Sequence, residues 1–325
     1  MSPIMVPLPS PGLPMPHVRL ADGDGLPALG LGTWKAPAGE VGDAVQTALE
    51  LGYRHIDCAS IYGNEAEIGA ALKQALSHSG LKREEIWITS KLWNDCHSPQ
   101  DVRPALERTL SDLGLERLDL YLIHWPVAHQ NGVLMPATAE EMIPPEALPL
   151  ADTWTAMEDV VDAGLVRHLG VSNVSARKLA SLLPHCRIRP VVNQVERHPW
   201  LQQKALLRFC QSEGIQLTAY APLGSGSSGQ PSPLLQDPEV LAIAAAHDCS
   251  PARVLLAWGI ACGTSVIPKS VRRERLADNL AATQLRLTAA DLARLNSLDR
   301  QHRFVDGSFW DLPGSPYSQQ AIWDE

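Results

Sequence analysis

The segment Leu118–His124 has the sequence Leu-Asp-Leu-Tyr-Leu-Ile-His, a short, mostly apolar run that ends in a polar residue. Such a run is typical of a strand covered on both faces, as in a parallel sheet flanked by helices. The pattern recurs along the chain, with amphipathic segments between the runs. The expected strands are Tyr53–Asp57, Ile86–Lys91, Leu118–His124, Val166–Val171, Pro190–Gln194, Gln216–Tyr220 and Ser265–Lys269, with a weak eighth near Ala281–Gln284.

Helix starts lie between several of these runs. Ser98-Pro99 and Ser250-Pro251 each place an N-cap serine before a proline at the first helical position. Thr288 with Asp291 three residues later resembles a capping box. Upstream, the runs 17–20 and 26–30 flank a turn-rich centre, which predicts a β-hairpin. Strand and helix therefore alternate about eight times after the hairpin.

This alternation permits an open doubly wound sheet or a closed (β/α)8 TIM barrel. Polar residues favour the barrel, because they stand at or just after the carboxyl ends of the expected strands. In a barrel these ends converge on one face, where the loops build the active site, whereas an open sheet would spread them along an edge. The residues at these positions are Asp57, Lys91, His124, Ser172, Asn173, Gln194, Tyr220 and Lys269.

Composition narrows the class of protein. The chain has 325 residues, of which 45% are hydrophobic, and a formal charge of −9, so we expect a folded protein without a general attraction for nucleic acid or anionic membranes. No apolar run approaches the roughly 20 residues of a membrane span, and no secretion signal is evident. The six cysteines are scattered without a CxxC pair. We expect a reduced, cytoplasmic protein with a flexible proline-rich arm (1–16) and a single domain (17–325).

Three of the strand-end residues, Asp57, Lys91 and His124, end consecutive strands, and Tyr62 follows Asp57 by five residues. Neighbouring strands lie about 4.8 Å apart, so these side chains can meet in the barrel mouth. A phenol has an ordinary pKa near 10, and a nearby ammonium group lowers it. We therefore expect Lys91, held by Asp57, to lower the pKa of Tyr62. The Tyr62 hydroxyl would then serve as a general acid that protonates an oxyanion as hydride arrives at the carbon bonded to it.

Ordered motifs connect these residues to a known family. They are Leu-Gly-Thr-Trp (31–34), Gly-Tyr-Arg-His-Ile-Asp (52–57), Tyr-Gly-Asn-Glu (62–65), Thr-Ser-Lys-Leu-Trp (89–93), Leu-Ile-His-Trp-Pro (122–126), Gly-Val-Ser-Asn (170–173), Asn-Gln-Val-Glu-Arg-His-Pro (193–199), Ala-Tyr-Ala-Pro-Leu-Gly-Ser (219–225) and Ile-Pro-Lys-Ser (267–270). The chain resembles the aldo-keto reductases nearly from end to end. The resemblance implies a TIM barrel that reduces aldehydes and ketones with NADPH, using Asp57, Tyr62, Lys91 and His124.

The same resemblance implies a cofactor site. Ser172, Asn173 and Gln194 would hydrogen-bond the nicotinamide carboxamide, and Tyr220 would stack on its ring. The basic segment 269–275 would hold the adenosine 2′-phosphate, because Arg and Lys suit phosphate contacts. The implied cofactor residues are Thr33, Trp34, Ser172, Asn173, Gln194, Tyr220, Leu223, Ser225, Lys269, Ser270, Val271, Arg275, Asp278 and Asn279. No metal is implied, and a monomer is expected.

Gly224–Gly229 matches the GxGxxG pattern, but it does not open a helix and is not a Rossmann fingerprint. The resemblance instead implies a loop over the pyrophosphate, while a flexible linker remains an alternative. For the substrate, Trp34, Trp93 and Trp125 are expected to form an apolar wall near Tyr62. The insert 127–150 and the C-terminal tail 304–323, expected over the active-site face, would determine substrate preference.

Each site residue taken alone also has a structural explanation, such as a cap, a buried histidine or loop packing. Their joint order at strand ends favours function. The chain has no HxH or HExxH motif, which a metal-dependent barrel hydrolase would need. It also has no Tyr followed four residues later by Lys, which a short-chain dehydrogenase would need. A cofactor-binding regulatory barrel with little turnover remains the alternative. The expected partner is a small carbonyl compound, without nucleic acid or membrane.

Overall fold

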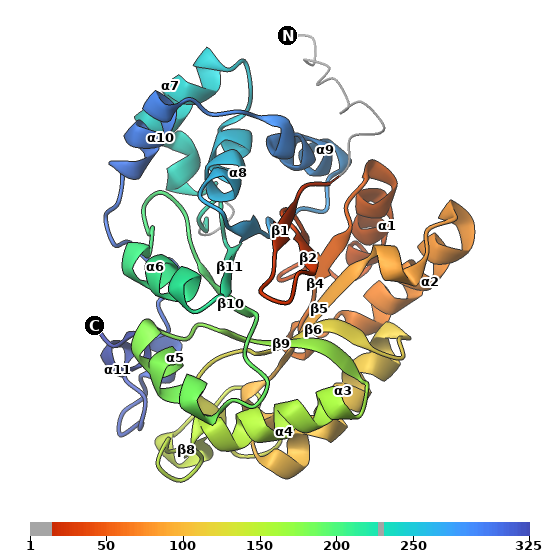
Figure 1. Ribbon diagram of the computed structural model, residues 1–325, viewed down its shortest axis with the longest axis vertical. Helices are drawn as coiled ribbons and strands as arrows, with labels where there is room; N and C mark the ends of the chain where they lie inside the picture. Colours follow the sequence, from red (N-terminus) through yellow and green to blue (C-terminus); the bar gives the residue numbers. More distant parts are fainter. Residues whose placement is uncertain (1–14, 227–230) are drawn as a thin grey trace.

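The computed structural model describes residues 15–226 and 231–325. At its centre is an eight-stranded sheet in the order β3-β4-β5-β6-β9-β10-β11-β12, with every neighbouring pair parallel. Parallel bridges from Leu29 to Val266 and from Gly32 to Lys269 close the sheet between its first and last strands. The fold is therefore the expected (β/α)8 barrel (Figure 1). The strands are β3 Leu31–Gly32, β4 His55–Asp57, β5 Trp87–Leu92, β6 Leu118–Ile123, β9 Val166–Ser172, β10 Val192–Glu196, β11 Gln216–Tyr220 and β12 Ser265–Val266.

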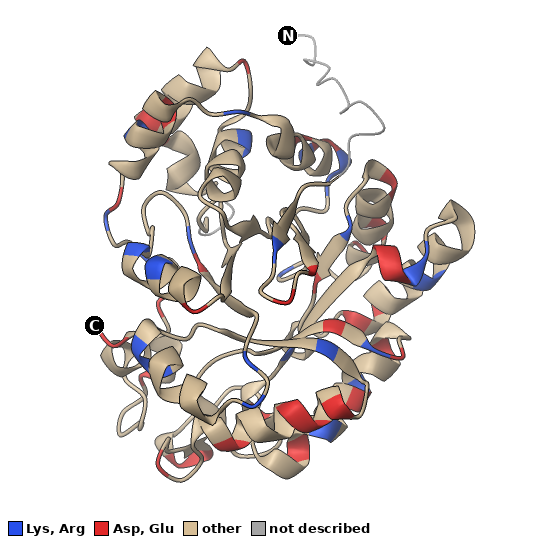
Figure 2. Ribbon diagram, viewed as in Figure 1, with Lys and Arg blue, Asp and Glu red and all other residues tan. Residues whose placement is uncertain are grey.

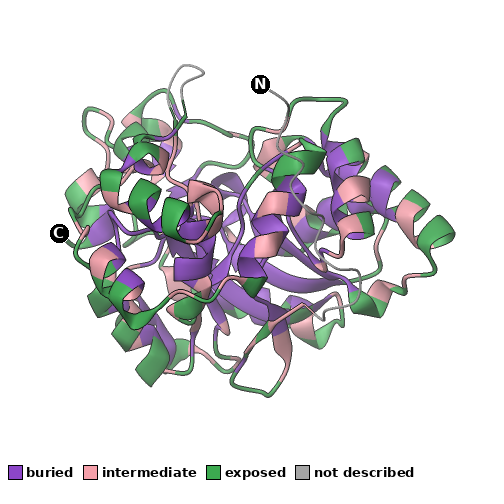
Figure 3. Ribbon diagram, turned by 90° about the horizontal axis from the view of Figure 1, so that it is seen from above, coloured by how far each residue is buried: buried purple, intermediate pink, exposed green. Residues whose placement is uncertain are grey.

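Helices surround the barrel and bury their apolar faces against it, so the strands are buried and the outer helix faces are exposed (Figure 3). Charged residues are concentrated on these outer helices and on loops (Figure 2). The longer helices are α1 Val41–Leu51, α2 Glu65–Ser79, α3 Pro99–Leu113, α4 Leu150–Asp162, α5 Ala176–Leu182, α6 Lys204–Ser212, α7 Pro238–Ala246, α8 Pro251–Ala261, α9 Arg273–Ala281 and α10 Ala289–Asn296. Short 3-10 helices cover Ser60–Tyr62, Arg83–Glu85, Asn94–Cys96, Ala139–Glu141, Leu183–His185, Pro233–Gln236, Ala282–Gln284 and Ser308–Trp310.

The expected helix starts are confirmed. The Ser250 side chain accepts a hydrogen bond from the Arg253 amide at the start of α8. Thr288 and Asp291 form the reciprocal bonds of a capping box at α10. Ser98 precedes Pro99 at the start of α3, although its side chain makes no capping hydrogen bond there.

The predicted hairpin is also confirmed and closes the amino end of the barrel. Strands β1 (His17–Arg19) and β2 (Gly25–Pro27) pair antiparallel. Leu20 and Leu26 pack with Trp87, Leu120 and Val192, which lie on barrel strands. The opposite, carboxyl end is left for the loops that follow the strands.

The prediction of a strand near Ala281–Gln284 is wrong. These residues form the last residue of α9 and a 3-10 helix. The eighth strand is instead β3, which follows the hairpin and has only two residues, Leu31 and Gly32. A two-residue strand that contains glycine has no apolar run to reveal it. Gly32 is required by the close packing, because a Cβ atom there would lie 2.8 Å from the carbonyl oxygen of Ile267.

The insert and the tail pack against each other. The insert forms an antiparallel ribbon of β7 (Ala128–His129) and β8 (Met142–Ile143), and the tail ends in helix α11 (Gln319–Trp323). The Tyr317 hydroxyl donates to the Ile143 carbonyl at 2.7 Å and accepts from the Ala128 amide at 3.0 Å. A shared apolar cluster joins the insert and the tail to Trp93, which follows β5, and to Trp125, which follows β6. The buried members of this cluster are Trp93, Trp125, Val127, Met142, Trp310, Tyr317, Ile322 and Trp323.

Two expectations fall mainly outside the described residues. The arm 1–16 is described only at Met15 and Pro16, and the loop Gly224–Gly229 only as far as Gly226. Within the described ranges, no single helix has the length and apolar character to cross a membrane. Only α7 and α8 taken together meet that length and composition, and they are bent by 92° at their junction.

Candidate active site

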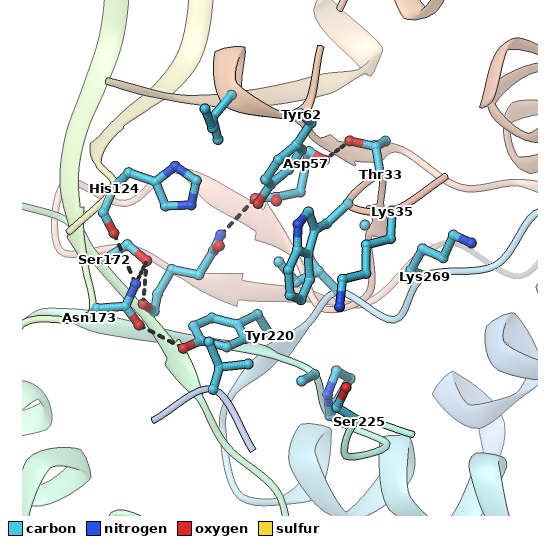
Figure 4. Close-up of a pocket in the computed structure, with 18 of the residues that line it drawn as sticks. Thr33, Lys35, Asp57, Tyr62, His124, Ser172, Asn173, Tyr220, Ser225 and Lys269 are labelled. Carbon is cyan, nitrogen blue, oxygen red and sulfur yellow. Dashed lines mark hydrogen bonds between the residues drawn. The ribbon is translucent and has the colours of Figure 1, made fainter. Parts of the chain in front are cut away.

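The strand-end residues converge on a cavity of about 600 Å³ at the carboxyl end of the barrel. Figure 4 shows Tyr62 and His124 toward one side of this cavity and Lys269 toward the other. The lining comes from nearly every strand end and from the tail. It includes Thr33, Trp34, Asp57, Tyr62, Trp93, His124, Trp125, Ser172, Asn173, Gln194, Tyr220, Leu223, Ser225 and Lys269.

A buried ion pair lies beneath Tyr62. The Lys91 ammonium donates to Asp57 Oδ1 at 2.5 Å, to the Cys58 carbonyl at 2.7 Å and to the Tyr62 hydroxyl at 3.4 Å. Asp57 ends β4 and Lys91 lies one residue before the end of β5, so the adjacent parallel strands bring the two side chains together. Both side chains are almost fully buried. The predicted carboxylate, ammonium and phenol therefore form one connected chain.

The expected lowering of the Tyr62 pKa is not met. Burial raises the pKa of Tyr62 to about 12, although the Lys91 charge acts in the opposite direction. The physical reason is that Lys91 lies closer to Asp57 and Cys58 than to Tyr62, so much of its charge is compensated there. Tyr62 is consequently protonated throughout the neutral range.

His124 lies beside Tyr62, with ring centroids 5.7 Å apart and an edge-to-face angle of 78°. Trp93 packs on the histidine in a similar way at 4.9 Å. Burial lowers the pKa of His124 well below its ordinary value, and the charge of Lys91 adds to this effect. The imidazole is therefore neutral, and it can donate one hydrogen bond to an oxygen in the cavity without carrying charge.

Amide and hydroxyl groups form the neighbouring wall. Asn173 donates to the His124 carbonyl at 2.9 Å and accepts from the Tyr220 hydroxyl at 2.7 Å. The Ser172 hydroxyl donates to the Gln194 carbonyl at 2.8 Å. Asn173 has a positive φ of 61°, a left-handed conformation that non-glycine residues adopt mainly where the surroundings enforce it. These hydrogen bonds hold the wall in place before any ligand binds.

Gln194 joins this wall to the buried ion pair. Its side-chain nitrogen donates to Asp57 Oδ2 at 2.6 Å, and no described residue donates to its amide oxygen. The amide oxygen of Gln194 can accept from the NH2 group of a carboxamide. Ser172 and Asn173 each keep a free acceptor lone pair for the same group, while their own donors are engaged within the wall. The residues therefore fit a nicotinamide carboxamide at this wall.

The basic segment supplies cations at the other side of the cavity. Lys269 lines the cavity, and burial and the Arg275 charge lower its pKa, while Glu40 opposes them. Among the described residues, no carboxylate forms an ion pair with Lys269 or Arg275, whereas Arg273 pairs with Glu50 on α1 at 2.9 Å. Glu40 acts on Lys269 more strongly than Arg275 does, but neither cation is neutralised by a direct ion pair among the described residues, so both can bind an anion.

The other predicted cofactor residues divide into two groups. Thr33, Trp34, Leu223 and Ser225 line the cavity, and the Thr33 hydroxyl donates to the Asp57 carbonyl at 2.8 Å. Asp278 instead pairs with Arg253 at 2.6 Å and accepts from the Ser250 hydroxyl. The predicted residues outside the cavity lining are Ser270, Val271, Arg275, Asp278 and Asn279, which lie in or just before α9.

The substrate side is apolar, as expected. Trp34, Trp93 and Trp125 all line the cavity, and Trp34 is 42% exposed at its rim. Away from the cavity, Trp87, Trp154, Trp200 and Trp258 are buried in the core. The sequence did not identify several further lining residues, among them Lys35, Ile61, Met135, Val305 and Phe309, although each of these five lies beside a predicted residue or within the insert or tail.

Together, the closed barrel, the tyrosine-lysine-aspartate chain and the amide wall define an oxidoreductase of the (β/α)8-barrel class. Comparison with known proteins identifies the family. Residues 25–300 match the aldo/keto reductase family model. The chain is 54% identical over 318 residues to an aldo/keto reductase of Synechocystis sp., covering 96% of this chain and 97% of that protein. It is 44% identical over 294 residues to human aldo-keto reductase family 1 member A1, covering 89% and 90% of the two chains.

Solved structures agree with this match. An aldose reductase from Schistosoma japonicum superposes with a TM-score of 0.85 at 43% identity, covering 91% of this chain and 96% of that chain. An aldose reductase from Giardia lamblia gives a TM-score of 0.83 at 44% identity, covering 88% and 97%. The chain belongs to the aldo/keto reductase family and is a carbonyl-reducing oxidoreductase. Members of this family generally use nicotinamide cofactors.

Proposed function

We propose that this protein reduces small aldehydes and ketones to alcohols with NADPH, with Tyr62 as the general acid. The observation that carries the proposal is the chain from Asp57 through Lys91 to Tyr62 beside neutral His124, in a cavity with Lys269 at its other side. We further propose that it acts as a cytoplasmic monomer. It needs neither nucleic acid nor a membrane.

When bound, the nicotinamide supplies hydride to the carbonyl carbon. The residues of the chain handle the oxygen: His124 donates a hydrogen bond that orients it, and Tyr62 transfers its proton to it. An alkoxide is a stronger base than a phenolate, so this transfer is favourable even with the raised pKa of Tyr62. Lys91 then stabilises the phenolate that remains, and Asp57 keeps Lys91 charged. The apolar wall excludes water from the reacting oxygen.

The preference for NADPH over NADH is supported by the cations of the basic segment. Only NADPH carries a 2′-phosphate, and Lys269 and Arg275, which form no ion pair with a described carboxylate, offer two cations for it. Ser172, Asn173 and Gln194 would hold the carboxamide at the opposite side, with Tyr220 beside the ring. Thr33, Trp34, Leu223, Ser225, Ser270, Val271, Asp278 and Asn279 would complete the contacts.

The substitution Tyr62→Phe tests the proposed acid. It removes the transferable proton and leaves the ring in place, so we expect kcat to fall by about 100-fold or more. The Kd for NADPH should stay within about twofold, because the phenol is not a proposed cofactor contact. Measurement is by NADPH absorbance against a panel of aldehydes, ketones and open-chain sugars.

An unchanged kcat in this variant would reject Tyr62 as the acid. Wild-type protein that binds NADPH but turns over no member of the panel would favour the regulatory alternative. As a control, Tyr121→Phe makes the same chemical change at a buried tyrosine on β6 that does not line the cavity, and it should keep the wild-type kcat.

A further inference from the structure

Glu196, the last residue of β10, is a fully buried carboxylate that the proposed chemistry does not use. Its Oε1 atom accepts from the backbone amide of Phe304 at 2.7 Å, and Oε2 accepts from the amide of Val305 at 2.7 Å. His198, which is also fully buried, lies 2.9 Å from Oε1 through its Nε2 atom. A buried carboxylate satisfied in this way is strongly held, because hydrogen bonds to a charged acceptor are the stronger kind.

The two amides belong to the first residues of the tail, Phe304 and Val305, where the chain leaves the barrel for the active-site face. These two residues are the root of the tail. Val305 and Phe309 line the substrate side of the cavity. The Phe304 ring packs against Gly224, where an added Cβ atom would approach it to 2.8 Å. The positions of Val305 and Phe309 in the cavity therefore depend on where Glu196 holds the backbone at the start of the tail.

The register of the barrel explains the location of this anchor. Glu196 pairs with Tyr220 across β10 and β11, so it lies at the rim directly beside a cavity-lining residue. Further along, Trp323 donates to the Asp306 carbonyl at 2.6 Å, and Tyr317 bonds the insert. Those contacts fix the distal tail, whereas Glu196 is the group that bonds its root to a barrel strand.

We propose that Glu196 is a positioning residue for substrate selection: by accepting both amides, it sets how far Val305 and Phe309 reach into the cavity. This proposal rests on the carbonyl reduction proposed above. Only a carboxylate offers two acceptor atoms here, because the NH2 group of a glutamine would face one of the amide donors. A large carbonyl substituent contacts the tail, whereas a short one reaches only Tyr62, His124 and the neighbouring tryptophans.

The test is Glu196→Gln, assayed with 1-naphthaldehyde and with propanal. Loss of a hydrogen bond to a charged group corresponds to a change of about tenfold or more in an equilibrium constant such as a binding affinity. We expect KM for naphthaldehyde to change by about this factor, with kcat and the KM for propanal within about twofold of wild type. Glu213→Gln is the matched control, since it makes the same chemical change at a partly exposed carboxylate paired with Arg189 at 2.7 Å. This control variant should change neither KM nor kcat for either aldehyde.

Hydrogen exchange supplies a readout that does not depend on activity. The amides of Phe304 and Val305 should be strongly protected in the wild type and lose this protection in Glu196→Gln. Rapid exchange of both amides in the wild type would overturn the anchor even if the variant does not fold. An equal loss of kcat/KM for both aldehydes would indicate a purely structural role and overturn substrate selection. A wild type that reduces neither aldehyde would contradict the proposed function, while exchange would still test the anchor.

Discussion

The balance of charge around single residues determines what the cavity can bind. Arg273 and Arg275 are two positions apart on α9, yet Arg273 pairs with Glu50 outside the barrel. Arg275 has no such partner among the described residues and instead perturbs Lys269. Two arginines of the same helix are therefore predicted to have different roles.

The substitution Arg275→Ala should weaken NADPH binding about tenfold or more and leave NADH binding within about twofold. The reason is that only NADPH presents a phosphate to this side chain. Titration of the tryptophan fluorescence with each cofactor measures both values. Arg273→Ala changes the net charge equally and should leave both cofactors unaffected. Equal weakening of NADPH and NADH in Arg275→Ala would exclude a 2′-phosphate contact.

The sequence is sufficient to predict residues whose place depends on strand position. Asp57, Lys91 and His124 were predictable because each stands at or next to a strand end, and strand ends meet in a barrel. The pKa of Tyr62 was not predictable, because its direction depends on how burial and the distance to Lys91 compare. Val305 and Phe309 reach the cavity only through the packing of the tail, which leaves no local pattern in the sequence.

At the scale of elements, the barrel tolerates almost no added volume where strands approach closely. Gly170 on β9 illustrates this, because a Cβ atom there would lie 2.5 Å from the Val192 carbonyl oxygen and 2.6 Å from Leu122. The longer strands were predictable from their apolar runs. The two-residue strand β3 was not, since the hairpin before it and Val266 and Lys269 after it supply its pairing.

Gly170→Ala should therefore lower the free energy of unfolding by about 2 kcal/mol or more, since backbone atoms on β10 must move. Urea unfolding followed by circular dichroism measures the change. Gly42→Ala is the control, because its nearest atoms belong to the Glu67 side chain at 3.3 Å, and alanine favours helix α1. A Gly170→Ala protein as stable as the wild type would show that β9 and β10 can separate without cost.

At the scale of the whole molecule, neutral buried histidines make stability depend on pH. Burial lowers the pKa of His55 and of His97 to about 3, and it also lowers the pKa of His124 well below its ordinary value. The unfolded chain binds protons on these residues below about pH 6.5, whereas the folded chain does not. These histidines therefore do not reduce the free energy of unfolding above this pH, and they reduce it progressively as the pH falls below it.

His97→Gln isolates one such contribution. Between pH 6 and pH 5, its stability should decrease less steeply than that of the wild type, by about 1 kcal/mol per pH unit. Urea unfolding at both pH values gives the two slopes. Comparing variants removes the opposing effect of Glu65, whose pKa burial raises. His78→Gln, at an exposed position, should keep the wild-type slope, and an unchanged slope in His97→Gln would contradict a neutral buried imidazole.

The seam of the barrel has a consequence for synthesis. Its two sides come from opposite parts of the chain, since Leu29 and Gly32 pair with Val266 and Lys269. A ribosome must therefore translate through Lys269 before the residues on both sides of the seam exist together. A nascent polypeptide that stops before Lys269 has Tyr62 and His124 but neither cation for the phosphate, so retention of the dinucleotide would mark a chain that has passed this point.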